Sequence, residues 1–268
     1  MSTPPPRVAL VTGAGSPDGI GFHSARILAE SGVNVLLTGH SDRVQDRATE
    51  LRDAGLLASS HPADLTDSDA VSRLASWVQV TTGRLDALVA NHGMTSVHNP
   101  MENTGESGSI DTTSADQFRS SLERNLVSAF QLTKSLLPLI RLSPSGRVVF
   151  VSSVTGGTMA MRHEVSYASA KAGLEGLMRA LALDEAQNGV LVNAVAPGWI
   201  ATGSQTPHES LQGKTVPLGR SGLPEEVAST VAWLAGESAR YLTGRVLVVD
   251  GGNSIQEERE VRDARNPT

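Results

Sequence analysis

Tyr167 and Lys171 are the residues of this sequence whose types and spacing point most directly to chemistry. They stand four positions apart in the segment 167–171 (YASAK), which places both side chains on one face of a helix, one turn apart. A phenol has a pKa of about 10, and a neighbouring ammonium lowers that pKa by stabilising the phenolate. The pair can then exchange a proton with an alcohol or carbonyl oxygen, although such pairs also occur on ordinary helix surfaces.

Two other polar residues join this pair if the neighbouring elements form as predicted. Ser153 follows a predicted buried strand at 147–152, where its hydroxyl can hold a substrate oxygen. Asn125 lies inside a predicted helix at 114–137, where its amide can interrupt the helical hydrogen bonds and anchor a water molecule that leads to Lys171. Together with Tyr167, these residues form the predicted catalytic group.

A glycine-rich turn between the first predicted strand and the first predicted helix is typical of a dinucleotide site. The segment 12–21 (TGAGSPDGIG) leads directly into that helix. Glycine permits a tight turn and close approach of the backbone to a pyrophosphate, and the helix N-terminus offers unpaired N–H groups to phosphate. A tight turn without a ligand is the alternative. The residues predicted to hold the cofactor here are Gly13, Gly15, Ser16, Gly19, Ile20 and Gly21.

The end of the second predicted strand, within 37–43 (LTGHSDR), is expected to face the adenosine ribose of that cofactor. A carboxylate there usually selects NAD, whereas the small and basic residues of this segment leave room for a 2′-phosphate. His40, Ser41 and Arg43 are its candidate partners. Asp18 in the glycine-rich turn would repel the phosphate, and Asp42 is interpreted as a helix cap. NADP(H) is therefore favoured over NAD(H).

Four more residues are predicted along the cofactor. Asp64 follows the third strand, where its carboxylate can accept a hydrogen bond from the adenine amino group, and Leu65 comes next. A turn or cap residue is the alternative for Asp64. Asn91 and Gly93 follow the fourth strand beside the cofactor ribose, although asparagine can equally be a structural turn residue.

The elements that must position these residues alternate regularly between strands and helices. Short apolar runs, continuous rather than alternating, predict buried strands at 7–12, 33–38, 56–60, 85–90, 147–152, 191–196 and 246–250. Amphipathic stretches predict helices at 19–31, 42–54, 67–82, 114–137, 164–187 and 224–236. This order predicts one α/β domain over residues 1–268: a single-domain Rossmann fold, doubly wound, with a seven-stranded parallel sheet and helices on both faces.

Three segments fall outside this alternation. Residues 95–113 are polar and are interpreted as an exposed surface insertion. Residues 201–216 have little periodicity and are predicted to be a substrate lid, because ligands bind at the carboxyl ends of parallel strands. The fold itself is expected to span about 7–254, and the charged residues 255–268 are expected to form a flexible tail.

Composition excludes several classes of function. The net charge of −6 and the absence of a basic stripe argue against a nucleic-acid partner. The chain has no cysteine, so it has neither disulfides nor a cysteine nucleophile, and its seven histidines show no helical ligand pair that would predict a metal site. Neither a signal peptide nor a membrane span is recognised, so a cytoplasmic location is expected.

Taken together, the motifs resemble those of the short-chain dehydrogenase/reductase family, in particular 3-oxoacyl-(acyl-carrier-protein) reductases, over residues 7–254. The family's glycine motif matches 12–21, its Asn-Ala-Gly motif matches 91–93 (NHG), and its catalytic tetrad matches Asn125, Ser153, Tyr167 and Lys171. The segment 193–198 (NAVAPG) resembles the stretch before the family's lid, and 241–252 resembles its C-terminal signature. The cofactor contacts that this resemblance adds are Tyr167, Lys171, Pro197, Gly198, Ile200 and Thr202.

The resemblance implies hydride transfer between nicotinamide C4 and a carbinol or carbonyl carbon. Tyr167 would donate the proton, Ser153 would polarise the carbonyl, Lys171 would bind the nicotinamide ribose, and Asn125 would hold a relay water. The resemblance also implies a homotetramer or homodimer. The spacing between Ser153 and Tyr167 is one residue longer than usual, so Ser152 is the alternative serine.

Two questions of function stay open at this level. The substrate can be a ketone or secondary alcohol, or a 3-oxoacyl thioester on an acyl carrier. A catalytically silent relative that binds dinucleotide as a sensor or scaffold is the alternative from another class, as is a purely structural α/β protein. Silent relatives typically lack the tyrosine or the lysine, and both residues are present here.

Overall fold

Seven short apolar segments form one parallel sheet in the computed structural model, which describes residues 5–93 and 107–257. Every paired strand runs parallel to its neighbour, in the order β3-β2-β1-β4-β5-β6-β7. The strands are β1 (Val8–Thr12), β2 (Asn34–Thr38), β3 (Ala58–Ser60), β4 (Ala87–Ala90), β5 (Arg147–Val151), β6 (Leu191–Pro197) and β7 (Val246–Val249). The predicted parallel sheet is confirmed, and each strand lies within two residues of its predicted bounds.

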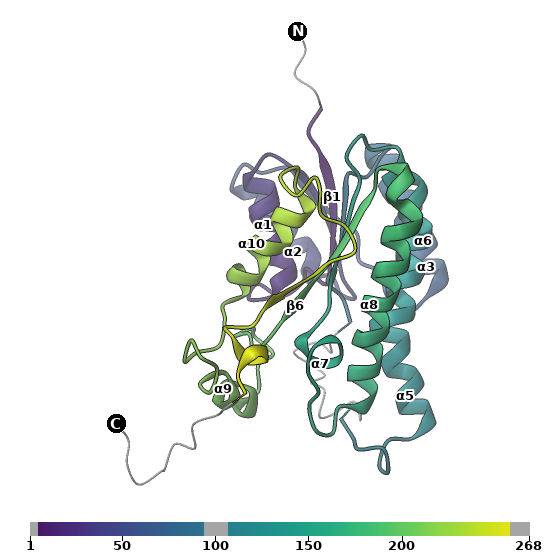
Figure 1. Cartoon of the computed structure of the whole chain (residues 1–268). Coiled ribbons are helices and arrows are strands. Elements are labelled where there is room, and N and C mark those ends of the chain that lie inside the picture. Colours follow the sequence, from purple (N-terminus) through teal and green to yellow (C-terminus); the bar gives the residue numbers. More distant parts are fainter. Residues whose placement is uncertain (1–4, 94–106, 258–268) are drawn as a thin grey trace.

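Helices cover both faces of the sheet (Figure 1). One layer contains α1 (Ile20–Glu30), α2 (Arg43–Asp53) and α10 (Pro224–Ala235); the other contains α3 (Ser68–Thr82), α6 (Ser128–Arg141) and α8 (Val165–Glu185). Successive side chains of a strand point to opposite faces. In β1, Leu10 therefore packs in the core beneath α3, α6 and α8, whereas Val11 packs in the core with Phe22 of α1. The doubly wound architecture is confirmed.

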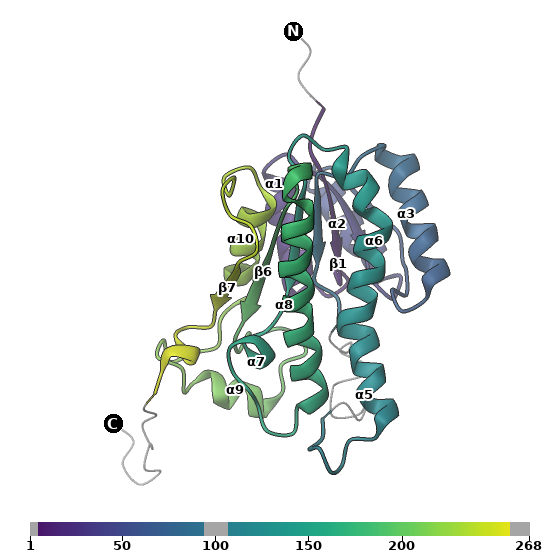
Figure 2. The same ribbon diagram turned by 45° about the vertical axis from the view of Figure 1, so that its right-hand side comes forward.

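The predicted helix at 114–137 is divided by a π-helical turn. It begins as α5 (Ala115–Leu122), passes through the π-turn η1 (Glu123–Val127) and continues as α6. The view in Figure 2 shows α5 extending below α6 on the same side of the molecule as α8. The helix also runs past Pro138 to Arg141, because Leu139 and Ile140 remain buried in the core.

Three short elements were not predicted from the sequence. They are α7 (Val154–Gly157), α9 (Pro207–Gly213) and the 3-10 helix η3 (Asn253–Ile255), whereas the 3-10 helix η2 (Ala186–Asn188) forms the end of the helix predicted at 164–187. The ordered structure thus includes Ile255, the first residue of the predicted tail, while 258–268 lie outside the described residues. Most of the predicted insertion, 94–106, also lies outside them. Over the part of the chain that is described, no helix is both long and apolar enough to cross a membrane.

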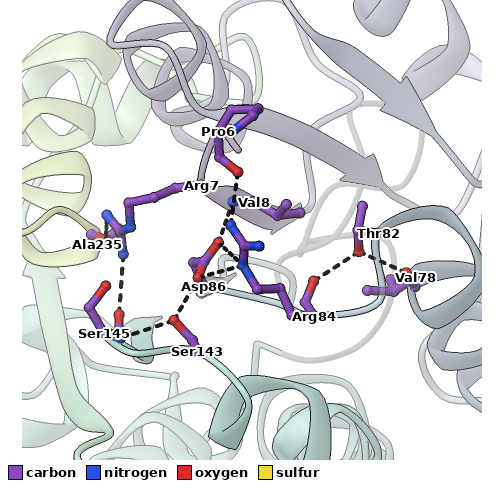
Figure 3. A network of polar contacts seen from close by, with 10 residues as sticks. All are labelled: Pro6, Arg7, Val8, Val78, Thr82, Arg84, Asp86, Ser143, Ser145 and Ala235. Carbon is purple, nitrogen blue, oxygen red and sulfur yellow. Dashed lines mark hydrogen bonds and ion pairs between the residues drawn. The ribbon is translucent and has the colours of Figure 1, made fainter. Parts of the chain in front are cut away.

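A buried carboxylate ties the amino ends of β1 and β4 to the loop before β5 (Figure 3). Asp86 is 2% exposed and accepts hydrogen bonds from the Val8 backbone N–H at 2.7 Å and from the Ser143 hydroxyl at 2.6 Å. Arg84 Nε lies 3.2 Å from both of its oxygens. Several donors to one buried charge offset the cost of its desolvation. This network therefore holds together the amino ends of the strands, opposite the end that carries the site.

Candidate active site

A cleft of about 1540 Å³ lies at the carboxyl ends of the strands. It includes the point between β1 and β4 where the chain's crossovers change direction, which is the ligand-binding position of doubly wound sheets. The predicted residues that line it are Gly13, Gly15, Ser16, Gly19, Ile20, His40, Ser41, Asp64, Leu65, Asn91, Gly93, Ser153, Tyr167, Lys171, Pro197, Gly198, Ile200 and Thr202. Gly21 and Asn125 do not line the cleft, but they lie against the lining residues Asn91 and Gly93, respectively.

Asn91 holds the glycine-rich turn in place. Its Nδ2 donates to the carbonyl oxygens of Thr12 and Gly13, at 3.2 and 3.3 Å. A Cβ at Gly21 would lie 2.6 Å from that nitrogen, and one at Gly13, where φ is +64°, would lie 2.8 Å from it. Both positions therefore require glycine, and Asn91, which also lines the cleft, has a structural role in holding this turn.

The N-terminus of α1 is open toward the cleft. Gly19 is its N-cap and provides no side-chain cap, and the first turn carries no acidic residue. Its unpaired N–H groups and positive dipole end thus suit a pyrophosphate. Asp18, which the sequence suggested would repel a phosphate, is exposed and is not among the residues that line the cleft. The turn therefore fits a dinucleotide.

Basic and small residues surround the part of the cleft beyond β2. His40, Ser41 and Arg43 all line it, and Arg43 Nε lies 3.3 Å from the Ser41 hydroxyl. Asp42 does not line the cleft, and its carboxylate accepts from Gln45 Nε2 at 3.1 Å. Asp42 is the N-cap residue of α2, as interpreted from the sequence, but its side chain makes no capping hydrogen bond. Its backbone is already helical (φ −60°, ψ −11°), whereas a capping side chain needs an extended residue.

Asp64 has a local structural role, one of the two interpretations that the sequence left open, and it also lies at the cleft. It lines the cleft beside the buried Leu65. Its Oδ1 also accepts hydrogen bonds from the Thr66 hydroxyl at 2.7 Å and the Thr66 backbone N–H at 2.9 Å. These bonds, together with the charge of nearby His40, hold the pKa of Asp64 below its usual value. The carboxylate is thus kept ionised in the part of the cleft that His40 also lines.

Tyr167 and Lys171 lie on the cleft face of α8, as their spacing predicts. Both side chains are buried, and Lys171 Nζ lies 5.6 Å from the centre of the Tyr167 ring and 3.1 Å from the Val151 carbonyl oxygen, to which it donates. Burial lowers the pKa of Lys171 to about 8. Burial raises the pKa of Tyr167 to about 12, although the Ser153 hydroxyl opposes the rise.

The pKa of Tyr167 is therefore raised, and not lowered as the neighbouring ammonium led us to expect. Desolvation of the phenolate is the largest cause, and the carboxylates of Glu164 and Glu209 add to it. The expectation of a lowered pKa was wrong, because sequence spacing alone reveals neither the burial of Tyr167 nor the charges that other elements place beside it.

A titration of Lys171 is directly measurable because the chain has only three lysines. In protein labelled with ¹³C-lysine, we expect one of three ε-carbon resonances to titrate near pH 8, since burial disfavours the ammonium. That resonance should disappear in Lys171→Met. Three resonances that all titrate near 10.5, the ordinary lysine value, would contradict the buried position of this amine.

The same shift predicts a dependence of stability on pH. Between about pH 8 and 10.5 the unfolded chain binds more protons at Lys171 than the folded one, so the free energy of unfolding should rise with pH by up to about 3 kcal/mol. Tyr167 has a raised pKa and acts oppositely between about pH 10 and 12. Urea unfolding should show the rise in the wild type and not in Lys171→Met.

Ser153, rather than Ser152, faces Tyr167. Its hydroxyl accepts the Thr155 N–H at 3.1 Å and is close enough to Tyr167 to lower its pKa. The Ser152 hydroxyl is buried and donates to Glu175 Oε1 at 3.2 Å. Because adjacent residues at the end of a strand point to opposite sides, only one of the two serines can face the tyrosine.

Asn125 lies in the π-turn and is 1% exposed. Its Nδ2 donates to the Ser121 carbonyl oxygen at 3.0 Å, while its Oδ1 has no partner within residues 5–93 and 107–257. A Cβ at Gly93, where φ is +131°, would lie 2.7 Å from this oxygen, so glycine is needed there. The predicted interruption of the helix at Asn125 is confirmed. A buried unpaired carbonyl oxygen is a group that an ordered water would satisfy.

His92 contributes to the site in a way that the sequence did not indicate. Its Nδ1 lies 2.7 Å from the Thr12 hydroxyl and its Nε2 lies 3.1 Å from the Ser128 hydroxyl, which donates to the Arg124 carbonyl oxygen at 2.8 Å. Burial lowers the pKa of His92 to about 3, so the ring is neutral. It joins β1 to the helix that carries Asn125. Its partners are distant in sequence, so no local signal could have identified it.

The predicted lid contains a helix that its weak periodicity did not suggest. In α9 the Thr206 hydroxyl accepts from the Glu209 N–H, and Glu209 Oε2 accepts from the Thr206 N–H at 2.7 Å, with Pro207 at the first turn. This capping box and proline were readable in the sequence. The cleft opposite α8, the helix of Tyr167, is lined by residues 204–206, His208 and Glu209.

Known proteins share this architecture. A family model for enoyl-(acyl carrier protein) reductase matches residues 13–254. The cis-4-hydroxycyclohexanecarboxylate dehydrogenase of Sinomonas cyclohexanicum is 37% identical over 250 residues, 92% of this chain and 96% of that protein. The 3-oxoacyl-(acyl-carrier-protein) reductase of Vibrio cholerae is 36% identical over 251 residues, again 92% and 96%.

A solved structure agrees with the sequence relatives. A variant of actinorhodin polyketide ketoreductase, crystallised with NADPH, superposes with a TM-score of 0.84 at 31% identity, covering 95% of this chain and 99% of that one. This score means that the two chains share one fold. The chain therefore belongs to the short-chain dehydrogenase/reductase family, oxidoreductases that bind a nicotinamide dinucleotide and act on CH–OH or C=O groups.

Proposed function

We propose that this protein interconverts a ketone and its secondary alcohol with NADP(H), using Tyr167 as the acid and base. The observation that carries the proposal is the meeting of Tyr167, Ser153 and Lys171 at one end of a cleft whose other end suits a dinucleotide. A bound nicotinamide would supply the hydride donor or acceptor. Nothing in the site favours a silent binding protein, because both the tyrosine and the lysine are present and buried.

The role of each side chain follows from its surroundings. Tyr167 would give a proton to the carbonyl oxygen during reduction and take it back during oxidation. Ser153 would hold that oxygen, since its hydroxyl faces the phenol. Lys171 would hold the nicotinamide ribose and stabilise the phenolate. Asn125 would hold a water on its unpartnered Oδ1 and so pass protons toward Lys171.

The substrate class rests on the relatives. Those quoted above act, by name, on a hydroxycyclohexane carboxylate and on 3-oxoacyl groups. We therefore infer a cyclic or open-chain ketone, 3-oxoacyl thioesters included. A panel of such ketones, assayed with NADPH and NADH through cofactor absorbance, tests the proposal; oxidation of neither cofactor with any ketone would count against it.

Preference for NADP(H) is expected to depend on Arg43. A guanidinium pairs strongly with a phosphate, and Arg43 lines the cleft where a 2′-phosphate would lie. We expect Arg43→Ala to raise the KM for NADPH about 10-fold and to leave the KM for NADH within about twofold. Arg52 of the same helix, whose guanidinium donates to the Ala58 carbonyl oxygen away from the cleft, provides the control substitution. Equal effects on both cofactors would remove the basis for the preference.

We also propose that the chain forms a homotetramer or homodimer through α5, α6 and α8. In support, Phe130 of α6 and Leu183 of α8 are exposed apolar side chains, 47% and 79% accessible. Light scattering in solution measures this directly, and a monomer would contradict it.

A further inference from the structure

Glu164 occupies the substrate end of the cleft. It is the N-cap of α8, three residues before Tyr167, so one helical turn separates the two side chains. It lines the cleft and is 5% exposed. The backbone around it is fixed: His163 has a φ of +63°, unusual for a residue other than glycine, and its carbonyl oxygen accepts the Gly108 N–H at 2.6 Å.

The two oxygens of this carboxylate differ. Oε1 accepts a hydrogen bond from the Ser107 hydroxyl at 2.7 Å, whereas Oε2 is buried and has no partner among the residues that the structure describes. A buried carboxylate oxygen without a donor destabilises the protein. Oε2 of Glu164 is therefore suited to accept a hydrogen bond from a donor on a bound molecule. Glu209, another carboxylate that lines the cleft, differs in this respect, since its Oε2 already accepts the Thr206 N–H.

We propose that Glu164 is a specificity residue whose Oε2 accepts a hydrogen bond from a hydroxyl or ammonium group of the substrate. The donor would lie about one helical turn from the reacting carbon, because Glu164 and Tyr167 are neighbours on one helix face. The substrate class is therefore a hydroxy- or amino-substituted ketone or alcohol, while a carboxylate at the same position is repelled. This inference rests on the proposed oxidoreductase function.

The test compares cyclohexanones that carry amino, hydroxyl, methyl or carboxylate groups at carbon 4. In Glu164→Gln the amide still accepts from Ser107 but presents an N–H₂ donor in place of Oε2. We expect kcat/KM to fall roughly 10- to 100-fold for the amino and hydroxyl ketones, to change less than about threefold for the methyl ketone, and to rise for the carboxylate.

Glu209→Gln is the matched control. Both glutamates act electrostatically on Tyr167, and each substitution removes one negative charge from the cleft. Glutamine also serves in a capping box, so α9 should be retained. Of the two, only Glu164 has a buried carboxylate oxygen without a partner among the described residues, and Glu164→Gln removes that acceptor. Equal changes in substrate preference in the two variants would show a general field effect and overturn the direct contact.

Measurements of substrate binding distinguish a failure of this inference from a failure of the proposed function. Calorimetry with NADP⁺ present measures the dissociation constants of the same ketones without turnover. Tighter binding of the amino and hydroxyl ketones than of the methyl ketone, lost in Glu164→Gln, supports the contact even if no ketone is reduced. Equal affinities in the wild type overturn it even if all are reduced. If Glu164→Gln fails to fold, Ser107→Ala keeps the carboxylate and must preserve the preference for donors.

Discussion

Replacing Tyr167 by phenylalanine is expected to lower kcat by about 10²–10⁴-fold, the usual contribution of a positioned general acid or base. The substitution removes only the hydroxyl, and the ring remains packed in its buried position on α8. Cofactor affinity should stay within about twofold, because the phosphate-binding turn and α1 lie elsewhere in the cleft.

The second tyrosine provides a matched control. The chain has two tyrosines, and Tyr241 is fully exposed, so Tyr241→Phe should leave turnover unchanged. Steady-state assays of both variants with one ketone, together with cofactor binding by fluorescence, separate loss of chemistry from loss of binding. Turnover by Tyr167→Phe at the wild-type rate would assign the proton transfer to another group.

Replacing Asp86 by alanine is expected to lower the free energy of unfolding by about 3–5 kcal/mol, the usual loss when one partner of a buried ion pair is removed. The Val8 N–H and the Ser143 hydroxyl would lose their acceptor, and Arg84 its counter-charge, in the network of Figure 3. Urea unfolding followed by circular dichroism measures the loss.

The control for Asp86 is an exposed carboxylate that also pairs with an arginine. Asp116 is 92% exposed in its side chain and lies 2.8 Å from Arg119, so Asp116→Ala should change the free energy of unfolding by about 0.5 kcal/mol or less. A similarly small change in Asp86→Ala would show that the buried network is not needed for stability.

The sheet was predictable because its strands are buried on both faces. Runs such as that of β5, where Val148, Val149 and Phe150 are all buried, read as continuous apolar segments, and the helical stretches between them leave only a parallel arrangement. The Tyr167–Lys171 pair was predictable for a related reason, since a helix places residues four apart on one face whatever surrounds it.

Features that depend on distant contacts were not predictable from local pattern. His92 joins β1 to α6 through the Thr12 and Ser128 hydroxyls, and these residues are 80 and 36 positions away from it. The raised pKa of Tyr167 results from burial and from Glu209 of α9, which the sequence does not place beside it. The unpartnered oxygen of Glu164 is likewise visible only once residues 107–109 lie against the start of α8.

Transfer of deuterium to the product alcohol from NADPH that carries deuterium at both C4 positions tests the central claim most directly. With a 4-substituted cyclohexanone as substrate, mass spectrometry should find one deuterium at the carbinol carbon with the wild-type protein, and almost no product with Tyr167→Phe. Product without deuterium, or labelled product formed equally by the tyrosine variant, would contradict hydride transfer with Tyr167 as the acid and base.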